Sequence, residues 1–117
     1  MDRVELKLAG IDYNEGIGRF AGNEALYVEY LIEFCEDDMF AKLKEAVLRK
    51  DYQEAFSCAH ALKGGCGNLS MNKLYHSIAK LTEELRADPE DSRVAALFEA
   101  AERCYIKAVE AVQNNKR

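Results

Sequence analysis

The chain has 117 residues, of which 16 are basic and 21 acidic, giving a net charge of −5. This length is enough for one domain whose core needs no disulfide or metal. The acidic balance, without a basic stripe, disfavours nucleic acid and anionic membranes as partners. There is no apolar run of about 18 residues and no signal-peptide pattern, so we expect a cytoplasmic protein.

The composition predicts an all-α fold. Alanine, leucine, glutamate and lysine dominate, and only one residue is proline. The cysteines fall on or near apolar stripes, where cysteine acts as a small hydrophobic residue rather than as part of a disulfide framework. They are Cys35, Cys58, Cys66 and Cys104.

The amino-terminal part predicts a tail followed by capped helices. Residues 1–11 alternate apolar and polar side chains, and we expect an extended lead-in because no second strand exists to pair with them. Asp12 and Glu15 form a capping box for a short helix to about residue 20. Asn23 caps the next helix. The sequence leaves open whether residues 24–49 form one bent helix or two.

Three long helices are expected in the rest of the chain. Asp51 caps a helix over about 52–69, and a helix with leucine and isoleucine at four-three-four spacing follows it. The last helix covers about 90–114 and ends in polar, basic residues that include Arg117. We therefore predict an up-and-down antiparallel four-helix bundle with short amino-terminal helical additions, forming a single domain over residues 1–117.

The helix expected over 52–69 places a histidine away from its apolar stripe. At about 100° per residue, His60 lies roughly 120° from the middle of the stripe and should point outward. Ser57, Gly64 and Gly67 share its side of the helix, and Lys63 lies between that side and the stripe. The stripe consists of Tyr52, Ala55, Phe56, Ala59, Leu62, Cys66 and Leu69.

Three glycines follow the histidine within this helix. Each glycine in a helix costs roughly 1 kcal/mol relative to alanine, so Gly64, Gly65 and Gly67 are unfavourable for stability alone. Residues that lower helix stability without an evident structural gain indicate a functional site. Gly64 would clear space for a bulky partner to approach His60. The alternative is that the glycines, Gly65 and Gly67 above all, end the helix as caps.

The run His60-Ala61-Leu62-Lys63-Gly64, followed by Gly67-Asn68-Leu69, resembles the H-x-L-K-G…N-L signature of histidine-containing phosphotransfer (HPt) domains. The similarity covers most of residues 10–86 and includes Gly10-Ile11-Asp12, residues 22–27 and residues 51–55. One departure is Ser70, where the family often has glycine. The resemblance implies a helical protein that carries a phosphoryl group on His60 between receiver domains of two-component phosphorelays.

The resemblance also implies roles for individual residues and partners. His60 would be phosphorylated, since histidine is a covalent nucleophile that is largely neutral near pH 7. Lys63 would offset the phosphate charge, and Ser57, Gly64 and Gly67 would meet the partner. The receiver would supply Mg²⁺, so we expect no cofactor in this chain. A closed helical bundle with a net charge of −5 is expected to be a monomer. No nucleotide-binding motif is present, and autonomous kinase activity is not expected.

Other interpretations of the sequence concern a metal site, the second histidine and the class of function. A metal site built from Cys58, His60 and Cys66 is disfavoured, because Cys58 and His60 point about 160° apart on a helix. His76 lies opposite the apolar seam of its helix and is expected to be a solvated surface histidine.

The alternative function is a non-catalytic helical-bundle adaptor that docks a signalling partner through the His60 face. The sequence leaves open which receivers take part, and whether the chain is free-standing or part of a hybrid kinase.

Overall fold

The computed structural model describes residues 1–116, and Arg117 of the predicted basic end lies outside the described residues. Helices are the only regular elements in this part of the chain, which confirms the all-α class. No helix among these residues is long and apolar enough to cross a membrane. The helices are α1 (Arg3–Leu8), α2 (Tyr13–Arg19), α3 (Glu24–Glu36), α4 (Met39–Leu48), α5 (Tyr52–Asn68), α6 (Asn72–Arg86) and α7 (Asp91–Asn114).

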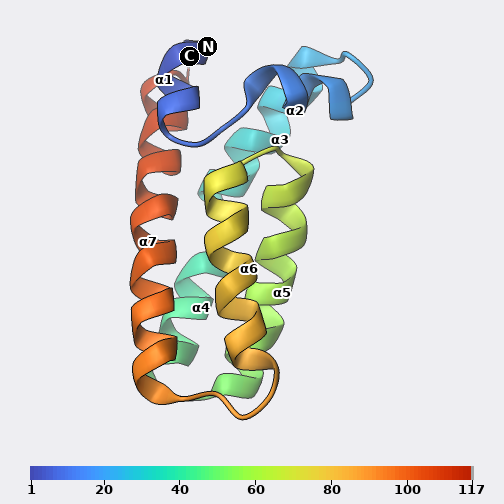
Figure 1. Cartoon of the computed structure of the whole chain (residues 1–117). Coiled ribbons are helices and arrows are strands. Elements are labelled where there is room, and N and C mark those ends of the chain that lie inside the picture. Colours follow the sequence, from blue (N-terminus) through green and yellow to red (C-terminus); the bar gives the residue numbers. More distant parts are fainter. Residues whose placement is uncertain (117) are drawn as a thin grey trace.

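The long helices lie side by side in an elongated molecule of 41 × 24 × 20 Å. Figure 1 shows α5, α6 and α7 running in alternating directions, with α4 behind them. Helix α6 packs between α5 and α7, α4 packs on α5 and α7, and α3 packs on α7. The short helices α1 and α2 lie at the end of the molecule where α5 turns into α6 (Figure 1).

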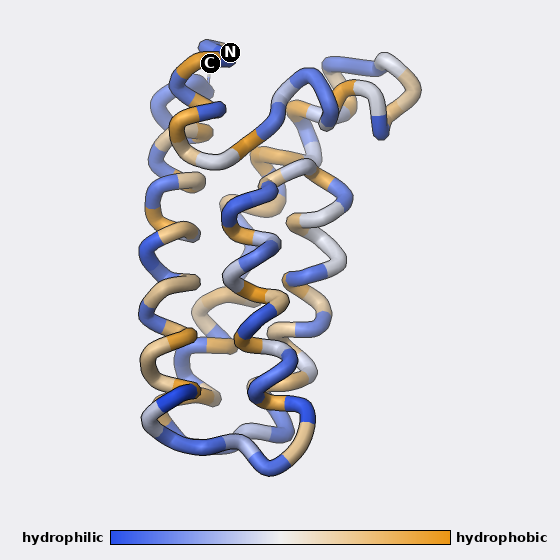
Figure 2. Tube along the Cα trace, in the orientation of Figure 1, coloured by the Kyte–Doolittle hydropathy of each residue, from blue (hydrophilic) through white to orange (hydrophobic). Residues whose placement is uncertain are grey.

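The core runs along the inside of these helices. Figure 2 shows apolar and polar residues alternating around each long helix. The expected seam of α6 is confirmed, since Leu74, Ile78, Leu81 and Leu85 are all buried. Burial of the Cys66 and Cys35 thiols raises their pKa to about 12 and about 11, so both stay protonated at neutral pH. These cysteines serve as small apolar core groups.

The expectation of an extended lead-in over residues 1–11 is wrong, because this segment contains α1. The Asp2 side chain accepts hydrogen bonds from the backbone N–H groups of Val4 and Glu5, at 3.0 and 3.1 Å, and so caps the helix. Leu6 is fully buried, whereas Val4 and Leu8 are 69% and 75% exposed. The alternating pattern suggested a strand, but the Asp2 cap and a single buried side chain are sufficient for a short helix.

Helices α3 and α4 are separate, which settles the question left open for residues 24–49. The Asp37 side chain accepts a hydrogen bond of 2.7 Å from the Met39 N–H and so separates the two helices. The predicted N-cap residues are confirmed, although the Asp12–Glu15 capping box is only half formed, because the Asp12 N–H donates to the Ser70 carbonyl at 2.9 Å. Asp12, Asn23 and Asp51 each accept a hydrogen bond from the backbone N–H three residues later, at 3.0, 3.0 and 3.2 Å.

Candidate functional site

His60 lies in the middle of α5 with its side chain exposed, as its angle to the apolar stripe predicted. The stripe itself is confirmed at Ala55, Ala59, Leu62, Cys66 and Leu69, which are buried. Tyr52 and Phe56 are only half-buried. The imidazole ring of His60 stacks on the Phe56 ring, with 5.9 Å between centroids and 22° between planes.

Gly64 differs from the other two glycines of α5 in what surrounds it. A Cβ placed on Gly65 would lie 3.3 Å from the Phe34 ring, and one on Gly67 would lie 3.1 Å from the Tyr75 ring. Those two glycines therefore admit aromatic side chains to the helix surface. A Cβ on Gly64 would have open space around it. Packing within the chain does not explain Gly64, which lies one turn from His60.

The interpretation of Gly65 and Gly67 as helix caps is wrong, because α5 continues through both to Asn68. Ser70 takes the capping position instead, with a φ of +55°. Its N–H donates to the Gly67 carbonyl at 3.2 Å, and the Met71 N–H donates to the Cys66 carbonyl at 3.0 Å. This pair of hydrogen bonds is a Schellman motif, in which glycine is usual. Serine adopts here the left-handed conformation that glycine would adopt.

Contacts from α2 and α3 hold the end of α5 in place. The Arg19 Nε donates to the Ser70 Oγ at 3.1 Å, and the Ser70 carbonyl accepts from the Asp12 N–H at 2.9 Å. The buried Tyr27 hydroxyl donates to the Leu69 carbonyl at 2.7 Å. Burial is the main reason that the pKa of Tyr27 is raised. These bonds compensate for the strained Ser70 backbone and fix the α5–α6 turn.

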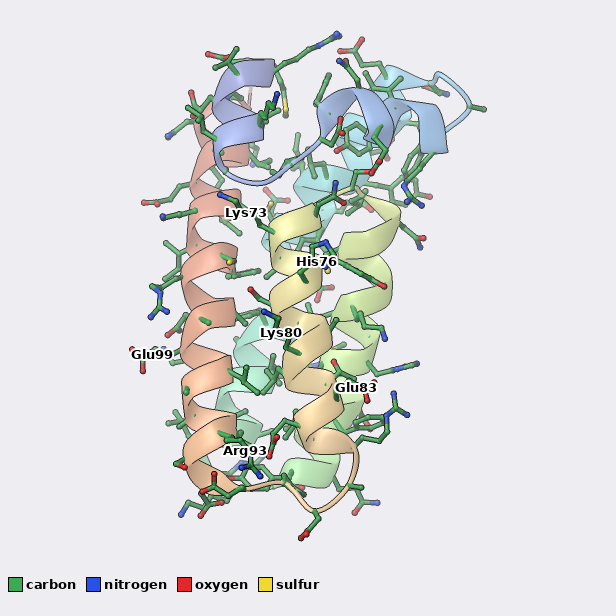
Figure 3. All side chains as sticks on the ribbon, viewed as in Figure 1. Lys73, His76, Lys80, Glu83, Arg93 and Glu99 are labelled. Atoms are coloured by element: carbon green, nitrogen blue, oxygen red, sulfur yellow. The ribbon has the colours of Figure 1, made fainter. Side chains whose placement is uncertain are left out.

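A polar depression lies beside Gly64 and Gly67. Lys63, half-buried on α5, and His76, exposed on α6, both line it, and Arg19 reaches it from α2. His76 is a surface histidine as expected, but it is part of the same hollow as Lys63. Figure 3 shows it on the outer side of α6. The depression is lined by Glu15, Arg19, Lys63, Gly64, Gly67, Asn68, Asn72, Tyr75 and His76.

An apolar groove lies between α3 and the carboxy-terminal half of α5, on the other side of Gly64. Leu26 and Tyr30 line it and are 37% and 47% exposed, and acidic Glu33 and Asp37 also line it. The sequence interpretation missed this α3–α5 groove. Its signal was a second stripe on α3, at Leu26, Tyr30 and Phe34, beside the buried one. The groove is lined by Phe20, Leu26, Tyr30, Glu33, Phe34, Asp37, Gly65, Asn68 and Leu69.

The predicted site residues thus lie together on α5 but differ in how far each is exposed to solvent. Ser57, Gly64 and His60 are exposed on α5, and Gly67 and Lys63 are half-buried beside them. Cys58 and Cys66 are buried, so they do not converge with His60 on a common point. Among residues 1–116, no three His, Cys, Asp or Glu side chains are placed to hold a metal ion.

These features define a helical domain that presents one histidine beside an open glycine on a long central helix. The model of the Hpt domain family matches residues 27–115, which include α4 to α7 and most of α3. The chain therefore belongs to the Hpt domain family, whose members take part in histidine phosphotransfer with receiver domains in two-component signalling. No match was found among curated proteins or among solved structures.

Proposed function

We propose that this chain is a phosphorelay phosphotransfer protein, in which His60 accepts a phosphoryl group from a receiver aspartate and passes it to another receiver. The observation that carries the proposal is the open space at Gly64, one turn from the exposed His60 ring, in a chain of the Hpt family. A glycine that costs helix stability without admitting a neighbour from its own chain is suited to admitting a partner.

The transfer needs a nucleophile and charge compensation from this chain. An imidazole nitrogen of His60 attacks the phosphorus of the aspartyl phosphate. An N–P bond forms, and the O–P bond breaks with its electron pair left on the aspartate carboxylate. Transfer to a second receiver aspartate reverses these bond changes. Lys63, three residues from His60, compensates part of the phosphate charge, while the receiver provides Mg²⁺ and its carboxylate ligands. Autonomous kinase activity is not part of the proposal.

Receiver docking uses the surfaces on the two sides of Gly64. The apolar α3–α5 groove accommodates the receiver's first helix, and its acidic rim at Glu33 and Asp37 favours basic residues there. Ser57, Gly64 and Gly67 lie under the receiver's active site, and Gly64 and Gly67 also line the polar depression. In this proposal the site sits on an up-and-down antiparallel four-helix bundle. Helices α3 and α4 together form its first member, and α5, α6 and α7 form the other three. The protein acts as a cytoplasmic monomer with a single domain.

The experiment is phosphoryl transfer from a phosphorylated receiver with Mg²⁺, comparing wild type with His60→Gln. Label on the wild type alone, labile in acid and stable in base, is the expected result for phosphohistidine. Folding of both proteins is checked by circular dichroism. Failure of the folded wild type to accept label from any of a panel of receivers would favour the alternative, a non-catalytic adaptor that binds a signalling partner through the His60 face.

A further inference from the structure

Three side chains from α5 and α6 form a row that ends at the His60 ring. The Phe56 ring stacks on the His60 imidazole, with centroids 5.9 Å apart. The Arg86 guanidinium lies over the same Phe56 ring, with its Cζ 5.4 Å from the centroid. Glu83 binds Arg86 through two hydrogen bonds, of 3.0 Å to the Nη2 and 3.4 Å to the Nε. The row therefore connects His60 to an ion pair on α6.

Phe56 is placed differently from the rest of the apolar stripe of α5. Ala55, Ala59 and Leu62 are buried, whereas Phe56 stays half-buried at the edge of the helix. Tyr52 is also half-buried, but its hydroxyl is used in a 2.6 Å hydrogen bond to Asp91. The aromatic and cationic contacts of Phe56 are those with His60 and Arg86. Core packing thus accounts for only part of the Phe56 side chain.

We propose that Phe56 is a positioning residue that holds the His60 imidazole in one orientation, and that Arg86, fixed by Glu83, holds Phe56. This inference rests on the proposed function, in which His60 is the nucleophile. An exposed histidine on a helix has more than one staggered rotamer available. Helical side chains lean toward the preceding turn, so the residue four positions earlier is the one that the imidazole meets.

Ring stacking at this distance favours one imidazole rotamer by about two- to tenfold in population. In-line attack on phosphorus requires a defined ring orientation, so this preference raises the fraction of productive complexes. The imidazole orientation affects the chemical step, which follows receiver binding. Loss of the Phe56 ring therefore lowers the kcat of transfer and leaves the KM for the receiver unchanged.

The Arg86–Glu83 ion pair on α6 holds the Phe56 ring in one orientation. Arg86 favours the ring face through a cation–π contact, and Glu83 limits the other orientations of the guanidinium. The Arg86 hydrogen bond and charge lower the pKa of Glu83, with a smaller contribution from Lys63, so the pair is ionised at neutral pH. Figure 3 shows Glu83 on the α6 side nearer α5, while Lys80 projects toward α7.

The experiment uses the full chain and three variants, Phe56→Leu, Phe56→Tyr and Arg86→Met. Arg93→Met is the matched control, because Arg93 also pairs with glutamates, at 3.2 Å from Glu84, but lies on α7. The chain has two histidines, so NMR gives two sets of imidazole signals, and His76 serves as the internal reference. Transfer rates are measured over a range of phosphorylated-receiver concentrations, which separates kcat from KM.

Phe56→Leu is expected to remove the ring-current shift of the His60 signals, leave those of His76 unchanged, and lower kcat about two- to tenfold at constant KM. Phe56→Tyr keeps the ring and should keep both the shift and the rate, and it remains informative if the leucine variant does not fold. Arg86→Met should show a smaller loss of kcat than Phe56→Leu, and Arg93→Met none.

Several outcomes would overturn the inference. They are unchanged His60 signals in Phe56→Leu, an unchanged kcat, or a raised KM with kcat intact, which would make Phe56 a docking residue. Equal losses in Arg86→Met and Arg93→Met would overturn the part played by Arg86. The NMR measurement needs no receiver. An unlabelled wild type would therefore count against the proposed function, while the His60 signals would still decide whether Phe56 orders the ring.

Discussion

Helices α5 and α6 are antiparallel neighbours of similar length, with 17 and 15 residues, and each exposes one histidine. Each histidine also has an aromatic neighbour. His60 stacks on Phe56, whereas His76 meets the edge of Tyr75 at an interplanar angle of 76°. Exposure and an aromatic contact are therefore not what distinguishes the two histidines.

The difference lies in the backbone that follows each histidine. Helix α6 contains no glycine, and its buried seam of Leu74, Ile78, Leu81 and Leu85 accounts for the helix by packing. Helix α5 contains three glycines, and Gly64 has open space where a side chain would be. Gly64 therefore lowers helix stability without admitting a neighbour from its own chain, and in the proposed function this surface meets the receiver.

The largest expected effect separates the two histidines. His60→Gln should abolish phosphoryl acceptance, because a glutamine amide cannot form the N–P bond. His76→Gln should accept label at the wild-type level, because His76 lies beside the site without reacting. Both variants are assayed with the same phosphorylated receiver. A similar loss in His76→Gln would show that the comparison assigns the reactive histidine wrongly.

A bulky residue at Gly64 should reduce transfer by about tenfold or more, because its side chain would fill the space that the receiver needs, and a 1 Å misplacement can cost about 100-fold. The matched control is Gly18→Gln on α2, where a Cβ would also have open space. Urea unfolding should show that Gly64→Gln is no less stable than wild type, since glutamine favours a helix over glycine. Normal transfer by a folded Gly64→Gln variant would show that the receiver does not need the open space at Gly64.

Lys63→Ala should slow transfer by up to about fivefold without abolishing it. An exposed charge pair contributes roughly 0.2–1 kcal/mol, and Lys63 is expected to act on the phosphate through its charge. Lys80→Ala, on the outer face of α6, is the control and should have no effect. Initial transfer rates at low and high salt measure the difference. A Lys63 variant as inactive as His60→Gln would assign lysine a larger role than charge compensation.

The smallest expected effect concerns stability. Gly64→Ala should raise the free energy of unfolding by about 1 kcal/mol, because the new Cβ meets nothing and helix propensity improves. Gly67→Ala should gain less or lose, because its Cβ would lie 3.1 Å from the Tyr75 ring, which must shift. Urea midpoints of the two variants give the comparison. Equal gains would mean that Tyr75 moves freely and that Gly67 also has no packing role.

The sequence was sufficient for much of the helical framework. Asp12, Asn23 and Asp51 were identifiable as caps, because a short polar side chain before an amphipathic run satisfies free backbone N–H groups locally. The outward position of His60 followed from helical periodicity alone. Such features depend on residues within one or two turns, so no knowledge of distant contacts was needed.

The α1 helix and the α3–α5 groove could not be obtained in this way. Val4, Leu6 and Leu8 alternate at a spacing of two, which favours a strand, whereas in the folded chain the Asp2 cap and the burial of Leu6 select the helix. The second stripe of α3 is visible in the sequence, but whether Leu26 and Tyr30 are covered depends on how far α3 stands from α5. That separation is a property of the packed helices.

By itself, the sequence determined the helical class, the caps, the orientation of His60 and the resemblance to the Hpt family. Only the tertiary structure decided why Gly65 and Gly67 are present, because Phe34 and Tyr75 reach them from other helices. It also decided the left-handed Ser70, which contacts from Arg19 and Asp12 support. Local rules act over a few residues, whereas these contacts join residues up to 58 positions apart and exist only once the helices have packed.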